Sequence, residues 1–189
     1  MNSVAQRDPI LTVNEYLALN ETSTIRHEYI DGHIYALAGA SKRHNDIVIN
    51  VVTRFREAAR RSECRVRTLE IMLRVSESRY YFPDVLVACN PDDIHDRAIA
   101  DPCVVVEVLS PSTEQVDQRE KLFAYKTIES LRAYYIVHQD RMTVENHWRD
   151  EDGNWWHGTL HAVGTLHVPC LDTDLPLADI YEGVTFDDE

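Results

Sequence analysis

The sequence contains no apolar stretch that approaches the roughly 20 residues needed to cross a membrane. Its first ten residues, MNSVAQRDPI, lack the apolar core of a signal peptide. We therefore expect no membrane partner and a cytoplasmic location. Linkers, internal repeats and low-complexity segments are also missing, and 189 residues suffice for one sizeable core. We expect a single domain over residues 1–189.

The sequence also has few cysteines and none of three common catalytic signatures. The four cysteines, Cys64, Cys89, Cys103 and Cys170, are far apart and form no CxxC pair. This spacing indicates neither a zinc site nor a disulfide framework, so we expect reduced and mostly buried thiols. The sequence has no GxSxG, HExxH or P-loop pattern that would point to a serine hydrolase, a zinc protease or a P-loop nucleotidase.

The sequence has few positively charged residues: 19 Lys and Arg stand against 32 Asp and Glu, which gives a net charge of −13. This balance argues against a broadly basic surface that binds nucleic acid. Residues 42–67 are the exception, since they hold eight basic and three acidic residues. This segment is either a solvated arginine-rich helix face or an anchor for phosphate.

The first third of the chain carries clear local signals. Thr12 and Glu15 have the spacing of a capping box and predict a short helix from about residue 13. Asp31-Gly32 joins two alternating runs and predicts a hairpin. Apolar residues at helical spacing from about 41 to 62 predict a long amphipathic helix.

Strand patterns dominate the rest of the sequence. CRVRTLEIMLRV and YYFPDVLVACN predict two strands that form a hairpin around SESR. Further strands are expected at 103–109 and 132–140, with a helix between them at 114–129 that Ser112 or Thr113 would cap. A hairpin at Asp152-Gly153, a short strand and an acidic tail complete the chain. This order predicts an α/β fold with a mixed central sheet flanked by helices.

One glutamate lies inside the apolar run VVVEVL. Alternation places Val105, Glu107 and Leu109 on one face of the strand and the other valines on the opposite face. Burying an ionised carboxylate there costs several kcal/mol unless a cation or hydrogen bonds compensate. The strand therefore predicts a partner for Glu107.

A second acid has a comparable position. Asp84 follows Pro83, which cannot donate to a strand ladder and therefore suits a strand entrance or an edge. Two carboxylates from adjacent strands, together with a backbone carbonyl, form a hard oxygen site suited to Mg²⁺ or Mn²⁺. The alternative for each acid on its own is a structural salt bridge or a cap.

The sequence resembles the Uma family of bacterial proteins assigned as endonucleases. The resemblance lies in FPDVLVAC followed by VVVEVLSPST, and then in Lys121 and Tyr125 of QREKLFAYKTIESLRAYYIV. RHEYIDGHIYALAGASKRHNDIVINVV is similar to the N-terminal hairpin and helix of that family, so the resemblance runs through nearly the whole chain. The family belongs to the PD-(D/E)XK nuclease superfamily. The resemblance implies a restriction-endonuclease-like fold and a nucleic-acid substrate, DNA in the first instance.

The resemblance also implies roles for individual residues. Asp84 and Glu107 correspond to the motif acids and would bind the metal, with the carbonyl of Val108 as a third ligand. The superfamily lysine should stand two residues after the glutamate, where this chain has Leu109. Lys121, in the following helix, resembles the relocated lysine of the family.

The alternative for Lys121 is a solvated surface lysine paired with Asp117 four residues earlier.

Three further residues are secondary candidates. His44 matches a family histidine and could contact phosphate or assist proton transfer, or be structural. Glu28 is either an additional carboxylate of the site or half of a cross-strand pair with an arginine. Glu70, in TLEIMLRV, would flank the site.

These residues support three hypotheses. In the first, Asp84 and Glu107 hold Mg²⁺, and Lys121 orients water or stabilises the phosphate during phosphodiester hydrolysis. In the second, Leu109 marks a catalytically silent binding or assembly module with a nuclease fold. In the third, the two acids act as acid and base without a metal. A homodimer would combine two basic faces across one duplex.

Overall fold

The computed structural model describes residues 10–37, 39–68, 70–90, 97–109 and 117–186. The helical elements are α1 (Val13–Thr22), α2 (Lys42–Ala59), α3 (Asp117–Lys126), α4 (Leu177–Ile180) and the 3₁₀ turn η1 (Pro169–Leu171). The first seven strands are β1 (His27–Ile30), β2 (His33–Ala36), β3 (Arg65–Thr68), β4 (Met72–Ser76), β5 (Arg79–Tyr81), β6 (Val85–Ala88) and β7 (Ala98–Ile99). The later strands are β8 (Pro102–Leu109), β9 (Ala133–His138), β10 (Thr143–Arg149), β11 (Trp155–His161), β12 (Thr165–Val168) and β13 (Thr173–Pro176).

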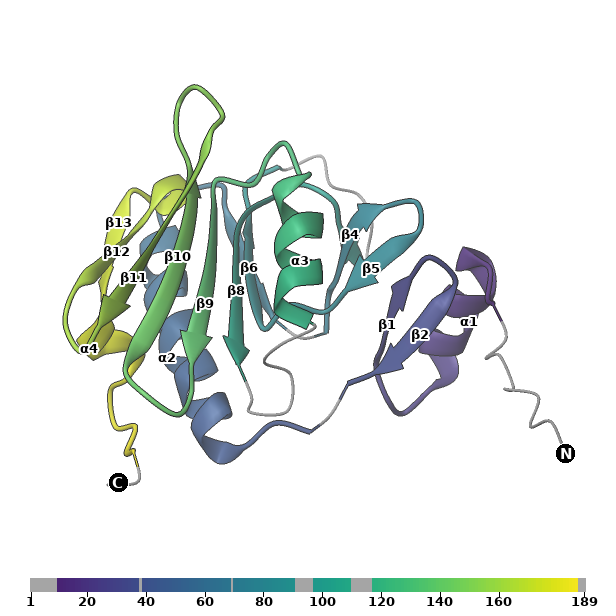
Figure 1. Ribbon diagram of the computed structural model, residues 1–189, viewed down its shortest axis with the longest axis horizontal. Helices are drawn as coiled ribbons and strands as arrows, with labels where there is room; N and C mark the ends of the chain where they lie inside the picture. Colours follow the sequence, from purple (N-terminus) through teal and green to yellow (C-terminus); the bar gives the residue numbers. More distant parts are fainter. Residues whose placement is uncertain (1–9, 38, 69, 91–96, 110–116, 187–189) are drawn as a thin grey trace, which may run out of the picture.

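A six-stranded sheet in the order β11-β10-β9-β8-β6-β3 forms the centre of the molecule. β8 and β9 are parallel neighbours, and α3 lies in the connection between them, as parallel strands require a long crossover. In Figure 1 the sheet lies between α2 and α3. The expected mixed sheet with flanking helices is therefore present.

The alternation predicted for the strand around Glu107 is confirmed. Val104, Val106 and Val108 pack in one hydrophobic cluster with the inward face of α2. Val105 and Leu109 pack in another cluster with Tyr125 of α3. Both faces of β8 are covered, and every residue of the strand is buried. Glu107 thus points to the side of the sheet that α3 covers.

A second sheet holds the N-terminal part of the chain in the order β2-β1-β5-β4-β7. α1 begins after Thr12, whose side chain and that of Glu15 form the expected capping box. Asp31 and Gly32 have φ angles of 48° and 96° in the tight turn between β1 and β2. Both are left-handed, which explains why the Asp-Gly pair is used. Tyr16 of α1 stacks on Tyr29 of β1 and fixes the helix on this sheet.

The segment between α2 and β8 differs from its prediction. The two strands predicted from CRVRTLEIMLRV and YYFPDVLVACN are four, because the chain leaves the central sheet after β3, forms the β4–β5 hairpin of the second sheet and returns as β6. The short strand β7 follows before β8. β3 and β6 then pair with each other, with Arg65 opposite Ala88. The hairpin around SESR is confirmed, but short alternating runs carry no signal for the sheet they join.

The end of the chain also contains more structure than expected. After the confirmed β10–β11 hairpin, a separate β12–β13 pair encloses η1 and is followed by α4. The predicted start of the third helix, at 114, and its caps Ser112 and Thr113 lie outside the described residues. No helix in the described part of the chain is long and apolar enough to span a membrane.

The prediction of four reduced thiols is wrong for this structure. Cys64 is joined to Cys89, and Cys103 is joined to Cys170. The register of β3 and β6 places the first two cysteines opposite each other, one residue beyond Arg65 and Ala88. The second bridge connects β8 with η1 across a sequence separation of 67 residues. Pairings of this kind depend on the fold, which cysteine spacing does not reveal.

Candidate active site

Asp84 and Glu107 lie opposite each other on neighbouring strands. Val85 of β6 pairs with Val106 of β8 in an antiparallel ladder, so one further step brings these two acids into register. Directly opposed residues of an antiparallel pair lie on the same face. Asp84 precedes the first residue of β6, as the strand entrance suggested by Pro83 requires. The two side chains are buried, with 6% and 8% of the residue surface exposed.

The carboxylate of Asp84 is fixed from two sides through its Oδ2 atom. The backbone N–H of Val108 donates to it at 2.7 Å, and Nε2 of His44 lies 3.2 Å away. His44 is in the first turn of α2, where Oγ of Ser41 caps the helix by accepting from the His44 N–H at 3.0 Å. His44 and Asp84, both candidate site residues, are therefore in direct contact.

This contact alters the protonation of His44. Burial alone would lower the pKa of its imidazole, but the hydrogen bond to Asp84 and the charge of that carboxylate outweigh burial. Glu107 adds to the same effect. The pKa of His44 is raised from its ordinary value as a result, so the cationic form persists to higher pH.

Glu107 has two partners on α3. The hydroxyl of Tyr125 donates to its Oε1 atom at 2.9 Å, and Nζ of Lys121 lies 3.4 Å from the same oxygen. Lys121 and Tyr125 are four residues apart and so lie on one face of the helix. Only 8% of Lys121 is exposed. The alternative of a solvated surface lysine is therefore wrong, and the side chain of Asp117, its expected partner, lies outside the described residues.

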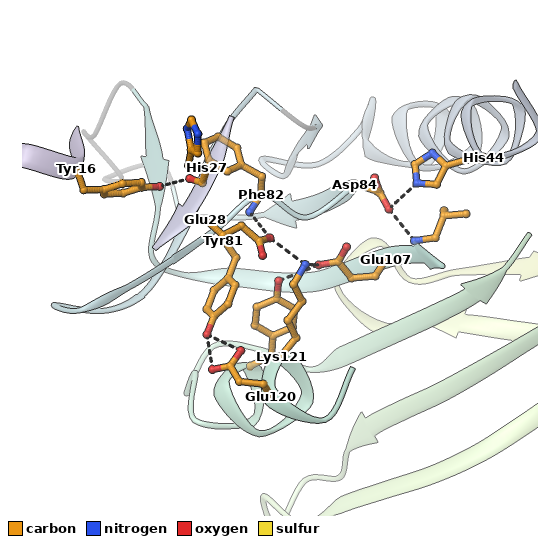
Figure 2. A network of polar contacts seen from close by, with 12 residues as sticks. Tyr16, His27, Glu28, His44, Tyr81, Phe82, Asp84, Glu107, Glu120 and Lys121 are labelled. Atoms are coloured by element: carbon orange, nitrogen blue, oxygen red, sulfur yellow. Dashed lines mark hydrogen bonds and ion pairs between the residues drawn. The ribbon is translucent and has the colours of Figure 1, made fainter. Parts of the chain in front are cut away.

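Glu28 joins this group from the second sheet. Its Oε1 atom lies 2.9 Å from Nζ of Lys121 and accepts the backbone N–H of Phe82 at 3.3 Å. Only 2% of Glu28 is exposed. Figure 2 shows the ammonium of Lys121 directed at the carboxylates of Glu28 and Glu107, with Asp84 and His44 beside them. In these contacts Glu28 pairs with a lysine, whereas the alternative was a cross-strand pair with an arginine.

The charges of this cluster are unbalanced. Among the described residues, Glu28, Asp84 and Glu107 supply three carboxylates, against the ammonium of Lys121 and the imidazole of His44. Burial raises the pKa of Glu107, Lys121 opposes this, and the two neighbouring carboxylates add to the increase, so the pKa is above its usual range. An additional cation would offset the repulsion among these acids.

The donor set fits a hard divalent cation. Oδ2 of Asp84 and Oε1 of Glu107 are taken by donors of the protein, whereas Oδ1 and Oε2 accept no hydrogen bond among the residues that the structure describes. Carboxylate oxygens of this kind are the preferred ligands of Mg²⁺ and Mn²⁺. Val108 lies next to Glu107, and its carbonyl as a third ligand stays a prediction.

Two of the predicted positions lie apart from this cluster. Glu70 is on the surface, with 72% of its side chain exposed, and forms an ion pair with Arg26. It does not reach Asp84 or Glu107 in the described contacts. Leu109, at the position of the superfamily lysine, packs into the apolar cluster with Tyr125. Lys121 brings its ammonium to Glu107 from the helix instead.

Tyr125 is a site residue to which no role was given from the sequence. Its hydroxyl is buried and bonded to Glu107, and burial together with that carboxylate raises the pKa of the phenol well above its usual value. The group is therefore a hydrogen-bond donor throughout the ordinary pH range. Its spacing of four residues from Lys121 was the signal that could have identified it.

Comparisons with known proteins identify the family of the chain. The Uma2 family model, described as "Putative restriction endonuclease", matches residues 13–175. The Synechocystis sp. protein "Uncharacterized protein slr1290" is 33% identical over 180 residues, which cover 94% of this chain and 95% of the relative. Another protein of that organism, "Uncharacterized protein sll1609", is 33% identical over 151 residues, covering 77% and 85% of the two chains.

A solved structure supports the fold. The crystal structure of "a putative nuclease belonging to DUF820 from Anabaena variabilis ATCC 29413" superposes with a TM-score of 0.78 and covers 93% of this chain and 99% of the other. The two sequences are 16% identical, so the likeness concerns the fold. It confirms the restriction-endonuclease-like fold expected from the sequence.

Proposed function

Because the chain belongs to the Uma2 family, we propose that it is a divalent-metal-dependent endonuclease that hydrolyses phosphodiester bonds, with DNA as the substrate. The observation that carries the proposal is the convergence of Asp84, Glu107 and Lys121 in one buried cluster. Two carboxylates with unbonded oxygens and one ammonium are the groups that such hydrolysis requires.

Each residue of the cluster has a distinct role in the proposal. Asp84 and Glu107 bind the ion through Oδ1 and Oε2, the oxygens that accept no hydrogen bond in the described structure. The contacts of His44 and Tyr125 hold the two carboxylates in fixed orientations. When bound, Mg²⁺ or Mn²⁺ supplies Lewis acidity, which acidifies water and polarises the phosphoryl group.

Lys121 acts on the substrate side in this proposal. Its ammonium orients the attacking water or donates to a phosphate oxygen as negative charge develops there. Glu28 keeps the amine in position through the 2.9 Å contact and draws it towards the carboxylates. Lys42, exposed in the first turn of α2 two residues before His44, adds a positive charge for the backbone of the nucleic acid.

Cleavage assays test the proposal. Supercoiled plasmid and single-stranded DNA are incubated with the full chain and Mg²⁺, Mn²⁺ or a chelator. We expect cleavage that needs the metal and falls at least about 100-fold in Asp84→Asn and Glu107→Gln. Glu70→Gln, which removes a carboxylate outside the cluster, is the matched control and should retain activity. Cleavage that survives both substitutions contradicts the assignment.

A silent nuclease-fold module is the second candidate, and one observation favours it. Leu109 is buried at the position of the superfamily lysine. Calorimetric titration with Mn²⁺ separates the two candidates, because a module without a metal site gives no heat of binding. Activity that persists in a chelator would instead support the metal-free hydrolase, in which Asp84 and Glu107 act as acid and base.

A further inference from the structure

A second cluster of metal-ligating side chains lies at the far end of the central sheet. It contains all four cysteines of the chain: Cys64 before β3, Cys89 after β6, Cys103 in β8 and Cys170 in η1. Four separate segments of the chain therefore deliver sulfur to one place. The metal-binding role proposed for Asp84 and Glu107 makes no use of these residues.

The sulfur atoms are close enough to act as a unit. The Sγ atoms of Cys89, Cys103 and Cys170 all lie within 4.8 Å of one another. Cys64 belongs to the same group, because its Sγ is bonded to that of Cys89 and lies 3.5 Å from the carbonyl oxygen of Cys170. The two disulfides are thus neighbours and not independent bridges.

The separation of the Sγ atoms of Cys89, Cys103 and Cys170, at most 4.8 Å, is close to the distance between sulfur atoms in a tetrahedral zinc centre. Four thiolates at a Zn–S distance of about 2.3 Å have sulfur atoms about 3.8 Å apart. Breaking the two S–S bonds would let the sulfurs of each bonded pair separate towards that spacing. The Sγ atom of Cys89 lies within 4.8 Å of those of Cys103 and Cys170, so it would approach them by at most about 1 Å. Small side-chain rotations suffice for such shifts.

The surroundings suit a bound cation with access from solvent. Cys64 and Cys103 are buried, whereas Cys89 and Cys170 are half-buried. Cys89, Cys103 and Cys170 line a surface pocket, which gives the ion a route to the sulfurs. Charged residues of both signs line the same pocket, the cations Arg132 and Arg149 and the acids Asp101, Asp150 and Glu151.

We propose that the four cysteines, in their reduced form, bind one Zn²⁺ as a structural Cys₄ site. Two equivalents of a dithiol reductant donate four electrons, break the two S–S bonds and become two cyclic disulfides. The four protein thiols then release four protons to solvent, and each thiolate donates one electron pair to Zn²⁺. The disulfide form is the oxidised, metal-free state of the same site.

The zinc site is separate from the candidate active site. Cys103 and Glu107 are four residues apart on β8, which corresponds to about 13 Å along the strand. Soft thiolates select Zn²⁺ and Cd²⁺, whereas the carboxylates of the active site select Mg²⁺ or Mn²⁺. Zinc would fasten η1 and the beginning of β3 to the ends of β6 and β8.

A cadmium titration of the full chain tests the proposal. The protein is reduced with a phosphine, dialysed without oxygen, and shown to contain four titratable thiols after denaturation. Addition of Cd²⁺ should produce a sulfur-to-metal charge-transfer band that saturates at one equivalent, and Zn²⁺ should abolish the band by displacing Cd²⁺. The absence of the band, or disulfides that resist reduction unless the protein unfolds, overturns the proposal.

Paired substitutions locate the site. Cys64→Ser/Cys89→Ser and Cys103→Ser/Cys170→Ser should each lose the band completely, since each removes half of the ligands. Asp84→Ala/Glu107→Ala should retain the full band at one equivalent. Loss of the band in this last variant, with its fold intact by circular dichroism, would move the cadmium to the active site and overturn the proposal. The result is independent of whether the chain cleaves nucleic acid.

Discussion

Lys121 and Tyr125, one turn apart on α3, contact the same oxygen atom of a carboxylate in the central sheet. The ammonium of Lys121 lies 3.4 Å from Oε1 of Glu107, and the hydroxyl of Tyr125 donates to that atom at 2.9 Å. One oxygen is thereby fully engaged, while the other accepts no hydrogen bond in the described structure. The helix consequently determines which face of the carboxylate remains available to a ligand.

Replacing Tyr125 by Phe should weaken both stability and activity. The substitution removes a hydrogen bond to a buried carboxylate with little change in volume, so we expect a loss of about 1–2 kcal/mol in the free energy of unfolding. Cleavage should fall because Glu107 is held by Lys121 alone. Urea denaturation and plasmid cleavage measure the two effects. Tyr35→Phe, at a half-exposed position of β2, is the control and should be neutral.

Replacing Lys121 by Met should have a larger effect, since two buried carboxylates lose their common cation. We expect a loss of about 3–5 kcal/mol at neutral pH. The pKa of Glu107 should rise further without Lys121, which at present lowers it. A carboxyl group with a raised folded pKa binds a proton more readily in the folded state, so stability decreases as the pH rises above about 4.5.

The pH dependence identifies this effect. Lys121→Met should be less destabilised at pH 5 than at pH 8, measured by urea denaturation at both values. Arg119→Met, which removes an exposed cation from the same helix, should show no such difference. Equal destabilisation of Lys121→Met at both pH values would mean that lost packing, and not unpaired charge, is responsible.

His147 should make the protein sensitive to mild acid. Burial lowers the pKa of this imidazole to about 4, and the charge of Lys126 acts in the same direction. Neither ring nitrogen has a hydrogen-bond partner among the described residues. A histidine with a lowered folded pKa takes up a proton more readily in the unfolded state, so stability falls as the pH drops from about 6.5 towards 4.

The expected contribution is about 2 kcal/mol between pH 7.5 and pH 5. His147→Phe, which keeps an aromatic ring against Tyr134, should remove that part of the pH dependence. His33→Gln on the exposed strand β2 should leave it unchanged. Unfolding titrations at closely spaced pH values provide the measurement, and identical slopes in wild type and His147→Phe would contradict the assignment.

Asn50 and Arg54, one turn apart on α2, hold the end of the chain by different means. Nδ2 of Asn50 donates to the carbonyl oxygens of Ile180 and Glu182 at 3.0 and 2.9 Å. Arg54 forms ion pairs with Asp179 and Glu182 at 3.3 and 3.2 Å, with 38% of its side chain exposed. The first residue satisfies backbone acceptors, and the second relies on charge.

Salt should separate the two contributions. Asn50→Ala should cost about 1–2 kcal/mol at any ionic strength, because it leaves carbonyl groups without a donor. Arg54→Ala should cost about 0.5–1 kcal/mol at low salt, and most of this should disappear in 1 M NaCl. Thermal denaturation of both variants at low salt and in 1 M NaCl measures the two effects. A salt-independent effect of Arg54→Ala would show that its aliphatic stem matters more than its charge.

Local signals in the sequence predicted local structure well. Thr12 and Glu15 located the start of α1, Asp31-Gly32 located the first turn, and the alternation around Glu107 assigned the faces of β8. Each of these signals involves residues that are close in the chain and obey one periodicity. The position of Asp84 and Glu107 on adjacent strands was also predicted from local patterns, and the strand register places the two residues opposite each other.

Contacts between residues far apart in the chain could not be predicted from such local signals. The contact between Glu28 and Lys121 joins strand β1 of the second sheet to helix α3, and spacing in the sequence carries no information about it. The same holds for the two cysteine pairs, because the spacing of the cysteines predicts separate thiols. Glu70 was considered because it lies in an alternating run, but the excursion of the chain into the second sheet carries it away from Asp84.

Helix α3 follows β8 and precedes β9 in the chain, but it lies outside the sheet that the two strands form, and this has a consequence for amide exchange. The two strands are hydrogen bonded directly to each other from Val104 to Leu109, so their ladder does not depend on the helix. Local opening of α3 would withdraw an amine and a phenol from Glu107 while the sheet remains closed. Exchange rates of the α3 amides, measured against those of β8, would therefore report how much of the time the site is assembled.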